Sequence, residues 1–190
     1  MVPMLGIMAS AISGNLSSYV SIATTTLTGS SATVTFSSIP ATYTHLQLRI
    51  MAQCNRPTYA GDSCLVTVNG DTAYNYPQHS IQGDGSTATA TGTTTSYNAL
   101  NIRNAMGSSA GPGFAAIVVD FLDYSNTSKN KTMRFLGGHD NNGTVSGYGG
   151  YMVFGSSLWL NTSAVTSLSL RPETGTLWNT YSSFALYGIK

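Results

Sequence analysis

Short stretches in which apolar and polar residues alternate run through the chain, and this period of two constrains the fold more than any other feature. Because successive side chains of a strand point to opposite faces of a sheet, such alternation predicts strands with one buried face. The clearest case is residues 46–52, where Leu48 and Ile50 alternate with Gln47 and Arg49. These residues are therefore expected to form a strand of a packed sheet.

The remaining strand candidates are separated by turn formers, such as Asn69-Gly70, and no stretch shows helical periodicity over more than two turns. The run 114–122 is continuously apolar, which favours a central strand buried on both faces. Residues 83–96 lack packing residues and are expected to form a long exposed loop. About eight to ten strands are predicted, in an all-β sandwich or barrel. The other candidates are residues 32–36, 64–68, 131–136, 150–160, 165–170 and 183–189.

Charged residues are scarce: the 190-residue chain has eight Lys and Arg and seven Asp and Glu, or 8% charged residues, where about 25% is usual. The net charge of +1, together with eleven Tyr, six Phe and two Trp, argues for an ordered domain rather than a disordered one. An active site needs clustered titratable groups, so we expect no enzyme, no catalytic residue and no cofactor.

The partners of the chain are constrained by the same composition. Nucleic-acid binding needs a basic stripe, but the densest cationic group is Lys129, Lys131 and Arg134, which we interpret as a solvated loop face. No apolar run reaches the 18 residues of a membrane span. We therefore expect neither nucleic acid nor membrane as a partner. A near-neutral surface favours association with other proteins or with further copies of the chain.

Two cysteines, Cys54 and Cys64, flank a segment rich in turn formers. If the flanking strands pair, the two sulfur atoms could bridge. Two buried thiols are the favoured interpretation, and the disulfide is left open. The sequence contains no CxxC motif and no Cys/His cluster, so we predict no metal site.

Residues 107–111 (GSSAG) match the G-x-S-x-G motif of serine hydrolases, and Asp120 and His139 follow Ser109 in hydrolase order. The motif works only where a strand turns sharply into a helix. Here Pro112 and then a predicted strand follow. We therefore predict that Ser109 is not a nucleophile.

The first fourteen residues are apolar and uncharged, and they end at Gly14. No Lys or Arg precedes the apolar stretch, so we interpret it as an arm that docks on a partner rather than as a signal peptide. The predicted organisation is an N-terminal arm, residues 1–14, and a β-sandwich domain, residues 15–190. The residues expected to anchor the arm are Leu5, Ile7, Met8 and Ile12.

Aromatic residues gather in a Gly/Ser-rich stretch that contains Tyr148, Tyr151, Phe154 and Trp159. Such rings either alternate between the core and a subunit interface or stack sugars. We expect Tyr148, Tyr151 and Trp178 at an interface between subunits. With few charges to protect the edges of its sheets, the protein is expected to cover those edges by association with further copies of itself.

Three segments are similar to a known family: MLGIMASAISG at residues 4–14, VTFSSIPATYTHLQLR at residues 34–49, and SSFALYGI at residues 182–189. Together they resemble small virion structural proteins of tailed phages that infect aquatic bacteria. The resemblance implies a jelly-roll-like antiparallel β-sandwich with an extended N-terminal arm, located on the exterior of the particle. It implies no catalytic residues.

Two functions follow as hypotheses. The first is a non-enzymatic capsid decoration (cement) protein that stabilises the phage head by contacting the major capsid protein or another virion protein. The alternative is a tail-fibre or baseplate module that binds a host surface glycan. Copy number separates them, because a cement protein is present in far more copies per particle than a fibre. Both roles commonly use threefold symmetry, so the protein is expected to be a homotrimer on the particle.

Overall fold

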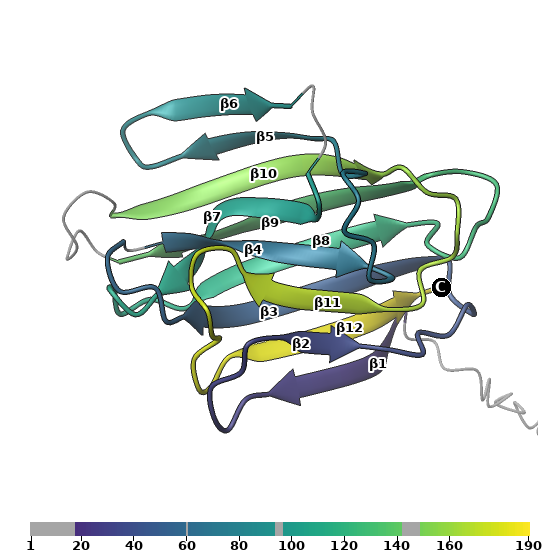
Figure 1. Cartoon of the computed structure of the whole chain (residues 1–190), viewed down its shortest axis with the longest axis horizontal. Coiled ribbons are helices and arrows are strands. Elements are labelled where there is room, and N and C mark those ends of the chain that lie inside the picture. The colour runs from purple at the N-terminus through teal and green to yellow at the C-terminus, as the bar shows by residue number, and fades with distance from the viewer. Residues whose placement is uncertain (1–17, 60, 94–96, 142–148) are drawn as a thin grey trace, which may run out of the picture.

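The computed structural model describes residues 18–59, 61–93, 97–141 and 149–190. These residues form twelve strands and no helix (Figure 1), which confirms the all-β prediction. None of them belongs to a helix that could span a bilayer. The strands are β1 (Tyr19–Thr26), β2 (Val34–Phe36), β3 (His45–Cys54), β4 (Gly61–Val68), β5 (Gln78–Gly83), β6 (Ala88–Gly92), β7 (Leu100–Ser108), β8 (Ala115–Leu122), β9 (Lys131–Asp140), β10 (Gly150–Trp159), β11 (Leu168–Pro172) and β12 (Ser183–Ile189).

The strands form a large and a small sheet. The large sheet has the order β1-β12-β3-β8-β9-β10-β5-β6, and the small sheet has the order β2-β11-β4-β7. All pairings within each sheet are antiparallel. A short parallel contact joins the two sheets where Gln53 and Cys54 of β3 meet Gly107 and Ser108 of β7. The core lies between the sheets, so each sheet has one inner and one outer face.

The connectivity is that of a jelly roll with two added strand pairs. Setting aside β5, β6, β9 and β10, the remaining strands form four-stranded sheets of order β1-β12-β3-β8 and β2-β11-β4-β7. Eight strands in two sheets connected in this way make the double Greek key of a jelly roll. The predicted jelly-roll-like sandwich is therefore confirmed. The pairs β5–β6 and β9–β10 extend only the large sheet, beyond β8 (Figure 1).

The core is filled by alternate residues of the strands, as the period of two predicts. In β3, Leu46, Leu48 and Ile50 are buried.

Trp178 is also buried completely, which corrects the prediction that it lies at a subunit interface. Its indole Nε1 donates to the carbonyl of Leu170 at 3.2 Å, and its ring packs edge-on against Phe184. Both contacts are internal, so Trp178 is unavailable to a second subunit.

Two further predictions about the strands were wrong. Much of the expected loop at residues 83–96 is the β5–β6 hairpin, in which Gly83 pairs with Ala88 and Ile81 pairs with Ala90. Strand β6 escaped prediction because neither of its faces is buried, so no alternation marks it. Strand β8 is buried on one face only: Ile117 and Val119 point into the core, whereas Ala116 is exposed.

Lys131 corrects the interpretation of the cationic group as a solvated face. Its side chain is completely buried at the start of β9. The ammonium group donates to the carbonyl oxygens of Asn126 at 2.5 Å, Lys129 at 2.7 Å and Thr162 at 2.9 Å. Lys131 therefore holds the segment between β8 and β9 in place through these hydrogen bonds and does not face a partner.

Candidate functional site

The outer face of the large sheet carries a row of apolar side chains that runs across several strands. Leu136 of β9, Phe154 of β10 and Ile81 of β5 are direct cross-strand neighbours. Their exposed fractions are 52%, 56% and 59%. The register continues the row through Val118 of β8 on one side and Ala90 of β6 on the other.

A second row lies beside the first and is hollowed at its centre. Met51 of β3 and Met152 of β10 are 57% and 66% exposed. Between them in the register stand the short residues Ala116 and Gly138. The result is an apolar hollow of about 660 Å³ with a methionine on either side. We call the two rows together the apolar face: Met51, Ile81, Ala116, Val118, Leu136, Met152 and Phe154.

A polar row borders the apolar face. Gln47 donates from Nε2 to Oδ1 of Asp120 at 2.9 Å, and Arg49 donates from Nε to Oε1 of Gln47 at 2.8 Å. The guanidinium group of Arg49 also lies over the rings of Tyr19 and Tyr187. The side chain of Arg49 is thus fixed by contacts with residues of its own subunit. Monomeric soluble proteins rarely leave large contiguous apolar patches uncovered, so the face has the character of a protein contact surface.

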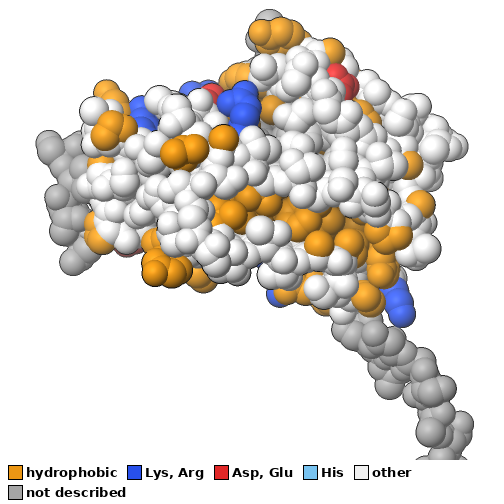
Figure 2. All heavy atoms as spheres, turned by 60° about the horizontal axis from the view of Figure 1, so that its bottom comes forward, with side chains coloured by type: hydrophobic (Ala, Val, Ile, Leu, Met, Phe, Trp, Pro, Cys, Tyr) orange, Lys and Arg blue, Asp and Glu red, His pale blue; other side chains and the backbone are white. Residues whose placement is uncertain are grey.

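Apolar surface is also present on a second side of the molecule. Figure 2 brings forward the side with the edge strands β1 and β2, and it shows a band of hydrophobic side chains with few charged ones around it. Ile22 and Ala23 of β1, and Leu27 just after it, pack against the core while staying partly exposed. The scarcity of charge in the sequence is therefore also visible on the surface.

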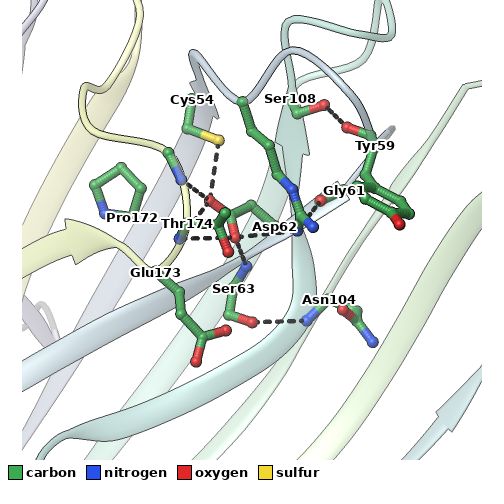
Figure 3. A network of polar contacts seen from close by, with 12 residues as sticks. Cys54, Tyr59, Gly61, Asp62, Ser63, Asn104, Ser108, Pro172, Glu173 and Thr174 are labelled. Carbon is green, nitrogen blue, oxygen red and sulfur yellow. Dashed lines mark hydrogen bonds and ion pairs between the residues drawn. The ribbon is translucent and has the colours of Figure 1, made fainter.

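A second candidate site is polar and is built around Asp62, at the start of β4 (Figure 3). The buried carboxylate accepts from the backbone amides of Ser63 at 2.9 Å and Gly175 at 2.8 Å. It also accepts from the amide of Thr174 at 3.2 Å and from the thiol of Cys54 at 3.4 Å. These bonds fix the turn after β11 against β4.

Arg56 connects this network to a small hollow. Its guanidinium group lies 3.5 Å from the Asp62 carboxylate, donates from Nη1 to the carbonyl of Gly61, and stacks over the ring of Tyr59 at 4.4 Å. The hollow has a volume of about 260 Å³ and a mainly polar lining. We call it the Tyr59 pocket; its lining residues are Arg56, Tyr59, Gly61, Asn104 and Tyr151.

His139 lies directly behind the pocket. A Cβ added to Gly61 would stand only 2.7 Å from Cε1 of His139, so the glycine is required by this close approach. The imidazole is 7% exposed, and both of its ring nitrogens lack a hydrogen bond within the described residues. Burial lowers the pKa of His139, although the charge of Asp140 opposes this shift. The ring is therefore neutral near neutral pH.

The two cysteines are free and buried, so the disulfide left open from the sequence is not formed. Burial raises the pKa of Cys54 to about 12 and raises the pKa of Cys64 further. Both thiols stay protonated at neutral pH and are poor nucleophiles and poor metal ligands. Within the described residues, His, Cys, Asp and Glu side chains do not gather in groups of three or more that would hold a metal ion.

The other residues singled out from the sequence lie at different places in the structure. Ser109 follows β7, and its hydroxyl donates to the carbonyl of Arg56; β8 comes next rather than a helix, so the elbow geometry is absent. Tyr151 is half-buried, with its ring 6.2 Å from that of His139, and lines the Tyr59 pocket. Tyr148 and the predicted arm anchors lie outside the described residues. Those anchors are Leu5, Ile7, Met8 and Ile12.

The apolar face was missed by sequence reasoning, although the sequence held a signal. Phe135-Leu136 and Met152-Val153-Phe154 interrupt the alternation with consecutive apolar residues, which place apolar side chains on both faces of β9 and β10. Comparison of the chain with models of known protein families and with curated proteins found no match. Its function is therefore proposed from the surfaces described above.

Proposed function

We propose that the protein is a non-enzymatic virion structural protein, a decoration (cement) protein that stabilises a phage head and is held there through the apolar face. The observation that carries this proposal is the apolar face itself: five large side chains, each more than half exposed, on four strands of the large sheet. In a cement protein, such a face would be covered by neighbouring proteins of the particle. The resemblance to small virion proteins supports the same role.

The energetics favour many contacts rather than one. Met51, Ile81, Leu136, Met152 and Phe154 are already about half-buried, so covering each contributes about 1 kcal/mol. The sum, roughly 5 kcal/mol, only matches the lower end of the cost of association, about 4–15 kcal/mol. A second contact is needed. We assign it to the N-terminal arm, residues 1–14, docking on the major capsid protein or another virion protein.

A homotrimer on the exterior of the particle is part of this proposal. The few charges of the chain allow neighbouring copies to approach without strong repulsion. The alternative function, a tail-fibre or baseplate module that binds a host glycan, is favoured by one observation, the aromatic and polar lining of the Tyr59 pocket.

Counting copies tests the proposal. Quantitative mass spectrometry of purified particles should find the chain at a copy number comparable to that of the major capsid protein. A copy number close to that of the tail-fibre proteins would favour the alternative. Absence of the chain from purified particles would contradict both functions.

A further inference from the structure

The Tyr59 pocket lies apart from the apolar face. Arg56 and Tyr59 belong to the connection between β3 and β4, Gly61 begins β4, Asn104 lies in β7 and Tyr151 lies near the start of β10. None of these residues belongs to the apolar face, so covering that face leaves the pocket open. A ligand in the pocket is therefore independent of the proposed attachment to a particle.

The pocket offers both hydrogen-bond donors and acceptors. Within the described residues, Arg56 uses Nη1 for the Gly61 carbonyl and leaves Nη2 without an acceptor. Asn104 donates from Nδ2 to Gln82 at 3.3 Å and leaves Oδ1 without a donor. A guanidinium donor and an amide acceptor beside tyrosine rings match a ligand that carries hydroxyl groups on an apolar ring.

The pocket carries no net charge. The charge of Arg56 is balanced by Asp62, which is buried and fixed by three backbone amides. The imidazole of His139 behind Gly61 is neutral. An anionic ligand would therefore find the guanidinium charge already compensated, and a neutral ligand fits better.

The pocket is also formed in advance of any ligand. Arg56 is fixed between the Gly61 carbonyl and the Tyr59 ring. Asn104 adopts a φ of 53°, a left-handed conformation that is strained for a residue other than glycine and is common at binding sites. Small-molecule sites usually measure about 300–1,000 Å³. The Tyr59 pocket, at about 260 Å³, has room for a single ring.

We propose that the Tyr59 pocket binds one neutral pyranose ring, such as a terminal hexose or N-acetylhexosamine of a surface glycan. The tyrosine rings pack against the carbon–hydrogen face of the sugar, and Arg56 Nη2 and Asn104 Oδ1 bond its hydroxyl groups. A virion protein with such a site would hold the particle near glycan-covered cell surfaces.

The test uses the purified full chain and four probes: the methyl glycosides of glucose, galactose, mannose and N-acetylglucosamine. Saturation-transfer NMR at millimolar sugar should show binding of at least one. Tyr59→Ala and Asn104→Gly should each weaken that binding by about tenfold or more. Glycine tolerates the φ of Asn104, so that variant removes the amide without straining the backbone.

The control is Tyr74→Ala, which removes a tyrosine that is 74% exposed and does not line the pocket. It should leave sugar binding unchanged. No binding of any of the four glycosides would overturn the proposal, as would equal binding by wild type and Tyr59→Ala. N-acetylneuraminic acid serves as an additional, anionic probe, and tighter binding of it than of every neutral sugar would contradict the neutrality of the site. Each of these results leaves the copy number on the particle unaffected.

Discussion

Lys131 is a buried charged residue that stabilises the fold through hydrogen bonds to backbone carbonyls. A buried ammonium group is costly unless hydrogen bonds satisfy it, and here three backbone carbonyls do so. Replacing it in Lys131→Met leaves those carbonyls without their donor. We expect the free energy of unfolding to fall by about 2–4 kcal/mol, measured by urea denaturation.

Lys129→Met is the matched control for this prediction. Lys129 pairs with Asp123, but its side chain is 55% exposed, and exposed ion pairs contribute at most about 1 kcal/mol. The control should lose little stability. Equal losses in the two variants would contradict the role given to Lys131.

His139 makes the stability of the fold depend on pH. Because burial lowers the pKa of folded His139 below its ordinary value of 6.5, the unfolded chain binds a proton more readily in the interval between the two values. The free energy of unfolding should therefore be fully retained above pH 6.5 and should fall as the pH drops below it.

Urea denaturation at about pH 7.5 and about pH 5.5 measures this dependence. His139→Phe provides the comparison, because phenylalanine keeps a planar ring and removes two buried nitrogens that have no hydrogen bond in the described structure. The variant should lose less stability between the two pH values than the wild type. The same loss in both proteins would show that other groups cause the effect.

At the scale of elements, the large sheet has a protected centre and an unprotected end. Strand β8 lies between β3 and β9 and buries every second residue. Strand β6 is an edge strand with one paired side and no buried residue. Stability is not uniform in such a sheet, since local opening is easiest where few side chains are buried.

Hydrogen–deuterium exchange of the purified protein should reveal this gradient. Peptides that contain residues 88–92 should exchange their amides much faster than peptides that contain residues 115–122. Comparable protection of the two strands would mean that β6 is covered in solution, for example by the edge of a second copy.

The same elements show how far sequence reasoning reaches. Sequence patterns predicted β3, β9, β10 and β12, and in each of these strands burial differs between the two faces. They could not find β6, since Ala, Thr and Gly side chains on an edge strand bury nothing. The continuous apolar run of β8 predicts a strand that is buried on both faces. Its outward residues Ala116 and Val118 instead belong to the apolar face, which one isolated subunit leaves open.

The candidate sites were harder to predict than the fold. The Tyr59 pocket joins residues that are up to 95 positions apart in the chain, from Arg56 to Tyr151, and no local pattern connects them. Trp178 was misplaced for a related reason. A tryptophan in a Ser/Thr/Asn-rich segment is expected to be exposed from the sequence alone. In the fold it is buried, and its indole donates to the carbonyl of Leu170.

At the scale of the whole molecule, the fold separates structural support from the exposed surfaces. The jelly roll buries the core between two sheets, while the added pairs β5–β6 and β9–β10 widen the large sheet and supply much of the apolar face. Leu136, Phe154, Met152 and Ile81 all come from these added strands. The extension is thus the part of the molecule that we connect to attachment.

A rebinding experiment tests that connection. Phe154→Asp and Met152→Asp place a carboxylate on the apolar face, where it would be desolvated on a particle, so each should weaken binding to particles stripped of the protein by about tenfold or more. Both residues are mostly exposed in the isolated chain, so the free energy of unfolding should change by only about 0.5 kcal/mol. Tyr181→Asp, at a residue that is 77% exposed and outside the face, should rebind like the wild type.

The most direct measurement is a cryo-electron microscopy map of the intact particle, with this chain fitted into density. We expect the chain on the outer surface of the head, in contact with threefold-related copies, with Met51, Leu136 and Phe154 of each subunit covered by a neighbouring protein. A map in which those three side chains face solvent, or in which the chain stands as isolated monomers, would contradict this expectation.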